Sequence, residues 1–142
     1  MKTIITTLLL FCAITISSQE ISSDIKYALK NDDAKTLKTL IKSANKNTCF
    51  EAGNSKYTLL NLAIKVDAID CFKLLLSEKV DVNKECTGKT PLIYTAKYGR
   101  LEMAKLLIKN KADISKTYKG RTALDYAKRY EKEEVYKYLS NL

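Results

Sequence analysis

Residues 90–95 read TPLIYT, and the same stretch recurs at an equal distance on either side, as TLLNLA at 58–63 and as TALDYA at 122–127. Each copy begins with threonine, has leucine two positions on and ends on a small residue. Downstream, DV at 81–82 returns as DI at 113–114 at the same spacing. A fixed period of this length is typical of stacked supersecondary units, each of which buries its apolar face against its neighbours.

The middle unit, residues 85–116, predicts two helices joined by a tight turn. Thr90 can cap the first helix by accepting a backbone N–H, and Pro91 suits the first helical position, where no N–H is needed. Gly99 stands where a helix ends and glycine is favoured. The second helix follows with an apolar face at helical spacing. This face consists of Leu101, Ala104, Leu107 and Ile108.

The unit resembles the ankyrin repeat. Residues 90–92 match the family's Thr-Pro-Leu-His start, with Ile93 in place of histidine, and Gly99 matches the glycine between the two helices. LEMAKLL at 101–107 matches the second-helix run, and KADI at 111–114 matches the Gly-Ala-Asp-Val exit, with lysine for glycine. The agreement of a dozen positions in order makes the resemblance specific.

The resemblance implies an all-α solenoid of about four stacked helix-turn-helix units, joined by turn or hairpin loops. The units span about 21–52, 53–84, 85–116 and 117–142 and form one domain at 19–142. The first unit is degenerate, and its connection to the second is three residues longer than the later ones. We expect the recurring leucines in the core: Leu60, Leu62, Leu75, Leu92, Leu107, Leu124 and Leu139.

The flanking units depart from the family pattern at two positions. Asp67 and Glu131 stand where the middle unit has its inter-helix glycine, and Leu59 and Ala123 stand where it has its proline. The departures concern the local geometry of the turns and leave the repeat assignment unchanged.

Residues 1–18 have the layout of a secretory signal peptide. Lys2 gives a positive start, an apolar run follows at 4–16, and Ser17 and Ser18 are small residues before Gln19. The run is short for a membrane span. We therefore expect cleavage after this segment and a mature protein that is periplasmic or secreted and has no membrane span. The alternatives are a retained anchor and a buried first helix.

The chain is basic, with 25 lysines and arginines against 16 acidic residues and a net charge of +9. Such a balance favours an acidic partner, an anionic surface or nucleic acid. Export argues against nucleic acid, so we expect a protein partner with an acidic surface, bound by a monomer. The alternative interpretation is a charge that serves only solubility.

The composition argues against catalysis. The chain has no histidine, which excludes Ser-His-Asp and Cys-His nucleophile systems and the common zinc sites. It has four glycines and no glycine-rich phosphate loop. Neighbouring carboxylates such as Asp32 and Asp33 point apart on a helix. We therefore expect no enzyme activity, no cofactor and no metal.

Three cysteines follow the N-terminal segment, so at most one internal disulfide forms among them. Cys71 falls within a second helix, where it behaves as a small hydrophobic residue. Cys49 and Cys86 lie in connections between units and are candidates for a disulfide in an oxidising compartment. The alternative is that both thiols stay unpaired.

The resemblance also implies where binding occurs. In ankyrin-like stacks the turn tips and the ends of the first helices form one concave face. Because equivalent positions recur there, cations and tyrosines form ladders, and tyrosine and arginine are frequent interface anchors. The alternative is a solvated edge without a partner. The candidate binding residues are Lys65, Lys89, Lys97, Tyr98, Tyr118, Lys119, Arg121, Arg129 and Tyr130.

The residues and the resemblance together favour a non-catalytic protein–protein interaction module. Two related hypotheses stay open. The first is an immunity or inhibitor protein that neutralises a secreted enzyme or toxin. The second is an accessory factor that stabilises an exported enzyme.

Overall fold

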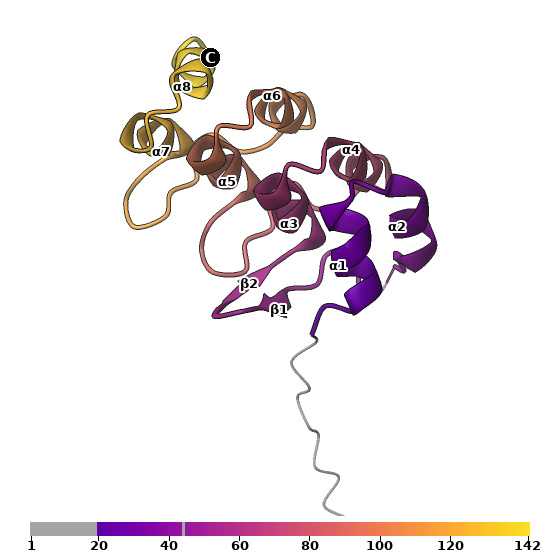
Figure 1. Cartoon of the computed structure of the whole chain (residues 1–142). Helices are drawn as coiled ribbons and strands as arrows, with labels where there is room; N and C mark the ends of the chain where they lie inside the picture. The colour runs from indigo at the N-terminus through magenta and orange to yellow at the C-terminus, as the bar shows by residue number, and fades with distance from the viewer. Residues whose placement is uncertain (1–19, 44) are drawn as a thin grey trace, which may run out of the picture.

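The computed structural model describes residues 20–43 and 45–142, so the predicted signal peptide lies outside the described residues. The described chain folds into helices joined by short turns, with one small hairpin (Figure 1). In chain order the elements are α1 (Ser23–Lys30), α2 (Ala34–Leu40), β1 (Phe50–Ala52), β2 (Ser55–Tyr57), α3 (Leu59–Val66), α4 (Ile69–Ser77), α5 (Pro91–Tyr98), α6 (Leu101–Lys109), α7 (Ala123–Arg129) and α8 (Glu133–Ser140).

The helices form four pairs that stack side by side (Figure 1). The first helices of the pairs pack in one row, in which α3 contacts α1 and α5, and α5 contacts α7. The second helices form an outer row, in which α2 contacts α4 and α6 contacts α8. The β1–β2 hairpin and the equivalent loops project beyond the inner row (Figure 1). We call the side made by the inner-row helices and these projections the inner face.

Recurring threonines begin the inner-row helices, as the sequence predicts. The side chains of Thr58, Thr90 and Thr122 each accept the backbone N–H three residues on. At the last of these, Asp125 accepts the backbone N–H of Thr122 in return, at 2.8 Å, and completes a capping box. This backbone hydrogen bond, together with one from the Thr122 hydroxyl, lowers the pKa of Asp125.

The turn inside each helix pair keeps one backbone geometry in spite of its varied sequence. In each of the four pairs, one residue of this turn has a left-handed backbone conformation: Asp32 (φ +51°), Asp67 (+62°), Gly99 (+71°) and Glu131 (+55°). Only one of the four is glycine, which reaches this region without steric cost. The departures from the family pattern therefore change the strain of the turn and not its shape.

The core runs continuously between the stacked pairs. Six of the seven predicted core leucines are buried, whereas Leu124 is only half-buried, because α7 belongs to the last described pair and no described helix packs beyond it. The predicted apolar face of α6 is correct at Ala104 and Leu107, but Leu101 and Ile108 are half-buried. Met103 takes their place in the core at 1% exposure.

The longer first connection contains a hairpin and a disulfide. Strands β1 and β2 pair antiparallel, with Phe50 opposite Tyr57. A disulfide joins Cys49, just before β1, to Cys86, in the loop before α5. The Cα atoms of the two cysteines lie 5.6 Å apart. The hairpin is one of the turn or hairpin loops that the resemblance implies, and each of its two strands is three residues long.

Polar contacts also tie neighbouring pairs together. The Asp32 carboxylate accepts the backbone N–H groups of Asp70 (3.0 Å) and Cys71 (2.8 Å), at the start of α4. Arg100 reaches back to the preceding pair, where its guanidinium donates to the carbonyl of Ile64 and forms an ion pair with Asp67 at 3.0 Å. These contacts lie at the turns, where the left-handed residues stand.

Candidate functional site

The inner face carries tyrosines and lysines from three consecutive units in contact with one another. At the end of α3, Lys65 lies with its ammonium 4.7 Å from the ring centre of Tyr57, to whose hydroxyl it donates at 3.4 Å. The Tyr57 ring lies 5.6 Å from the ring of Tyr94 in α5. The hairpin and the next inner helix are therefore joined by aromatic contact.

The chain of contacts continues toward α7. Tyr94 stacks on Tyr98 one turn later, with ring centres 6.2 Å apart, and Tyr126 stacks on Tyr130 at 6.1 Å. Lys97 lies between the two pairs, 5.3 Å from the ring of Tyr98 and 5.7 Å from that of Tyr130. Burial raises the pKa of Tyr94 to about 12, so this tyrosine stays neutral.

A second cluster lies at the projecting turn before α7. The ammonium of Lys89 sits 3.9 Å from the ring centre of Tyr118, and that of Lys119 sits 5.5 Å from it. Tyr118 and Arg121 exchange two backbone hydrogen bonds that close the turn. Gly88 allows the ring to pack here, because a Cβ at this position would lie 2.7 Å from a ring carbon of Tyr118.

The predicted ladder thus forms two clusters in the structure. Lys65, Lys97, Tyr98 and Tyr130 join the cluster along the helix ends, and Lys89, Tyr118, Lys119 and Arg121 join the one at the turn. Arg129 is exposed at the end of α7, next to Tyr130. Eight of the nine predicted residues therefore belong to these two clusters, and the ninth, Arg129, is a chain neighbour of one member. We call the two clusters together the cation–tyrosine surface.

The list of nine candidate binding residues lacks three members of this surface, Tyr57, Tyr94 and Tyr126. Tyr57 is 8% exposed and lies beneath Lys65, and Tyr94, only 3% exposed, stacks on Tyr98. A signal for two of them was present: Tyr94 and Tyr126 stand at equivalent positions of successive units, and each precedes a predicted tyrosine by four positions on a helix. Residues four apart meet on one helix face.

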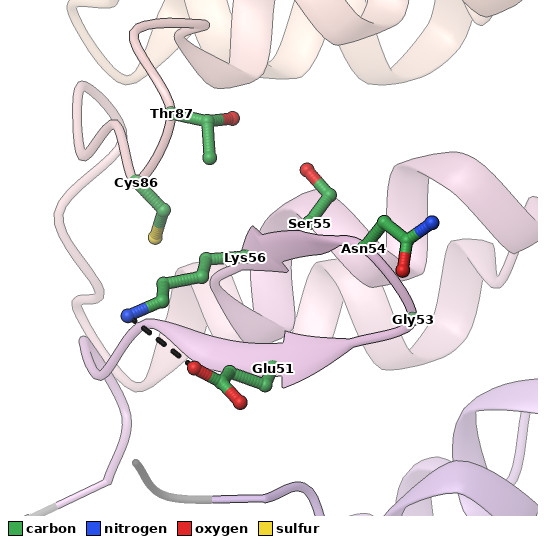
Figure 2. A pocket seen from close by; sticks show the side chains of 7 residues that line it. All are labelled: Glu51, Gly53, Asn54, Ser55, Lys56, Cys86 and Thr87. Atoms are coloured by element: carbon green, nitrogen blue, oxygen red, sulfur yellow. Dashed lines mark ion pairs between the residues drawn. The ribbon is translucent and has the colours of Figure 1, made fainter.

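A polar hollow opens next to the hairpin, between β2 and the loop that follows Cys86 (Figure 2). It measures about 510 Å³, and its lining consists of Glu51, Gly53, Asn54, Ser55, Lys56, Cys86 and Thr87. Glu51 and Lys56 form an ion pair across the hairpin at 3.5 Å, which neutralises the one carboxylate in the lining (Figure 2). The hollow can accept hydrogen-bonding groups but contains no nucleophile with an adjacent base.

Among residues 20–43 and 45–142, the one cysteine outside the disulfide has no chemical role at the surface. Cys71 is fully buried in α4, and its Sγ lies 3.7 Å from the carbonyl oxygen of Ala28. Burial, together with the neighbouring Asp32, raises the pKa of the thiol to about 12. A thiol held protonated is neither a nucleophile nor a metal ligand at neutral pH.

Two further findings concern residues 20–43 and 45–142. Within these ranges, no helix has the length and apolar character needed to cross a membrane. The same ranges contain no cluster of three or more cysteine, histidine or acidic side chains suited to hold a metal ion.

The stacked helix pairs, the threonine caps and the recurring turn define a repeat protein, and comparison with protein families identifies which one. The family model for ankyrin repeats matches the chain in three copies, over residues 25–118 and 60–142. The chain therefore belongs to the ankyrin-repeat family, and the prediction of an all-α repeat fold is confirmed. A comparison with curated proteins finds no match. Ankyrin repeats are generally protein–protein interaction modules and are typically non-catalytic.

Proposed function

We propose that this chain is an exported, non-catalytic ankyrin solenoid that holds one acidic protein partner on a concave inner face. The observation that carries the proposal is the position of Lys97 between Tyr98 of its own unit and Tyr130 of the next. Side chains of two units contribute to one surface there, as a face that binds a single partner requires.

The chemistry of the surface supports a protein partner with acidic groups. Tyrosine provides a large contact area with a polar tip and is enriched among the residues that contribute most to binding. Lysine adds steering and specificity toward opposite charge. The positive charges of Lys65, Lys89 and Lys97 each lie against a ring, which orients them without neutralising them. An acidic partner completes this arrangement.

Export is supported by the signal-like pattern of residues 1–18 and by the bond between Cys49 and Cys86, since disulfides persist in oxidising compartments. Fusing residues 1–20 to a reporter that is active only outside the cytoplasm tests this part. We expect reporter activity, and an N-terminus near Gln19 in mass spectra of the purified protein. An intact Met1 with a silent reporter would rule out export.

Capture from the extracytoplasmic fraction tests the binding surface. The variant Lys97→Glu/Arg129→Glu should lower the yield of the captured partner by about tenfold or more, because reversed charges repel acidic groups. The remaining binding should depend less on salt. The lost cation–π contacts of Lys97 should cost the fold only about 0.5–1 kcal/mol, which a melting curve can check.

The matched control is Lys105→Glu/Lys109→Glu in α6, in the outer row. Lys105 also lies against a tyrosine ring, that of Tyr138 at 5.8 Å, so the control loses a similar contact and reverses the same number of charges. It should capture the partner as well as the wild type does. Equal losses in both variants would mean that net charge alone drives the capture and would refute the surface.

A further inference from the structure

A small apolar hollow is lined by residues of α1, β1 and α3 and by Ile21. These three elements lie at the hairpin end of the stack (Figure 1). It measures about 180 Å³, below the roughly 300–1,000 Å³ of sites that hold drug-sized molecules. The hollow therefore suits one side chain and not a cofactor. Its lining consists of Ile21, Lys26, Leu29, Ala52, Leu62 and Val66.

The floor of the hollow belongs to the folded core, and its edge is open. Ile21, Leu29 and Leu62 are at most 9% exposed, so they are fixed by the packing of α1 against α3. Val66, in contrast, is 46% exposed at the end of α3. Covering this exposed aliphatic edge with another apolar group would remove surface from water and favour binding.

The hollow and the cation–tyrosine surface both include a residue at the end of α3. Val66 follows Lys65, whose ammonium lies over the ring of Tyr57. Lys26, an exposed residue of α1, lines the other side of the hollow. The nearby carboxylate of Asp67 is paired with Arg100 at 3.0 Å. Lys26 is the one charged residue of the lining itself, so the charge carried by the lining is positive.

We infer that this hollow anchors the partner by one leucine or isoleucine side chain that is flanked by acidic residues in the partner's sequence. The aliphatic side chain fills the hollow against Val66, and the acidic neighbours face Lys26 and Lys65. The inference rests on the proposed function and adds to it the position and the chemistry of an anchor. Charge attracts the acidic segment, and the hollow selects which residue of the segment is held.

Short synthetic peptides separate the two contributions. The probes are fluorescent peptides of glutamate and serine that carry one leucine, placed near either end, and the same peptides with alanine in place of leucine. Binding to the full mature chain is measured by polarisation. With leucine near at least one of the two ends, the leucine peptide should bind about tenfold tighter than the matching alanine peptide. The reason is that burying a leucine side chain releases more free energy than burying a methyl group.

Protein variants locate this gain. Val66→Ser should abolish most of the leucine-over-alanine preference, and Ala52→Leu, which fills the hollow from inside, should do the same with the edge intact. Ile114→Ser is the matched control, since this aliphatic residue is 50% exposed and lies outside the lining. It should leave the preference unchanged. One variant removes the apolar edge of the hollow and the other fills it, so the test still holds if one of the two folds poorly.

The outcomes distinguish the inference from the proposed function. Acidic peptides that bind more tightly than lysine–serine peptides, but without preference for leucine, would reject the anchor and leave the cation–tyrosine surface standing. A leucine preference that survives both Val66→Ser and Ala52→Leu would also reject it. Failure of every acidic peptide to bind would reject the proposed function and, with it, the anchor.

Discussion

The third unit, residues 85–116, and the first, residues 21–52, reach the same helix-pair geometry by different means. In the third unit, Thr90 caps α5 and Gly99 occupies the left-handed turn, so the local residues match the local structure. In the first unit Asp32 occupies that turn at φ +51°, a strained position for a residue with a side chain.

The irregular first unit is tied to the following units by residues far apart in the chain. The Asp32 carboxylate caps the start of α4, whose own N-cap residue, Ala68, makes no side-chain hydrogen bond. The bond from Cys49 to Cys86 then ties the long connection to the loop before α5. A repeat can therefore depart from the family pattern where a contact with the next unit offsets the departure.

The largest expected effect comes from the core of the regular unit. Leu92 in α5 is 1% exposed, and α5 packs against both α3 and α7. Leu92→Ala should lower the free energy of unfolding by about 2–5 kcal/mol, through lost burial and the cavity it leaves. Urea denaturation followed by circular dichroism measures the change. Leu142→Ala, at a residue 58% exposed, is the control and should lie within about 0.5 kcal/mol of the wild type.

The second-largest expected effect comes from removing the disulfide that ties the first connection to the loop before α5. Cys49→Ser/Cys86→Ser opens a loop that spans a sequence separation of 37 residues, which should cost about 2–4 kcal/mol because the unfolded chain gains freedom. A reducing agent should weaken the wild type by a similar amount and leave the variant unchanged. If reduction had no effect on the wild type, packing alone would hold the first connection in place.

Much of the structure of the regular third unit can be predicted from the sequence, because the residues that begin and end its helices act locally. The threonine at Thr90 and the glycine at Gly99 act within one helix turn, and the fixed period of the repeat carries the same signals to the other units. The candidate surface follows in the same way, since equivalent positions must stack. Tyr94 and Tyr126 were missed, although their spacing carried the same signal.

The rest depends on contacts between residues far apart in the chain. The capping of α4 by Asp32 joins residues 38 and 39 positions apart, and no pattern within either segment indicates it. Strand β1 is three residues long, too short for an alternation to be recognised. The apolar hollow at Val66 arises only where α1, β1 and α3 meet.

The smallest expected effect sharpens the comparison most, because one substitution should have opposite signs at two equivalent turns. Glu131 stands at φ +55° in the last unit and is exposed, and its side chain makes no hydrogen bond or ion pair with the described residues. Glu131→Gly should therefore relieve the left-handed strain, which is roughly 1–2 kcal/mol, against the roughly 0.5–1 kcal/mol entropic cost of glycine. The net result should be a gain of up to about 1 kcal/mol, measured by urea denaturation.

Asp32→Gly restores the same family residue at the same turn, and it relieves less strain, because a short polar side chain tolerates the left-handed region better than glutamate does. It also removes the carboxylate that accepts the N–H groups of Asp70 and Cys71, and loss of such a cap costs about 0.5–2 kcal/mol. We therefore expect the first unit to gain nothing or to lose about 1 kcal/mol, whereas the last unit gains. Asp32→Asn, which tolerates the turn and keeps one acceptor oxygen, should lie between. Equal gains from both glycine substitutions would show that the carboxylate contributes nothing to α4, and that the first unit stands by packing and its disulfide alone.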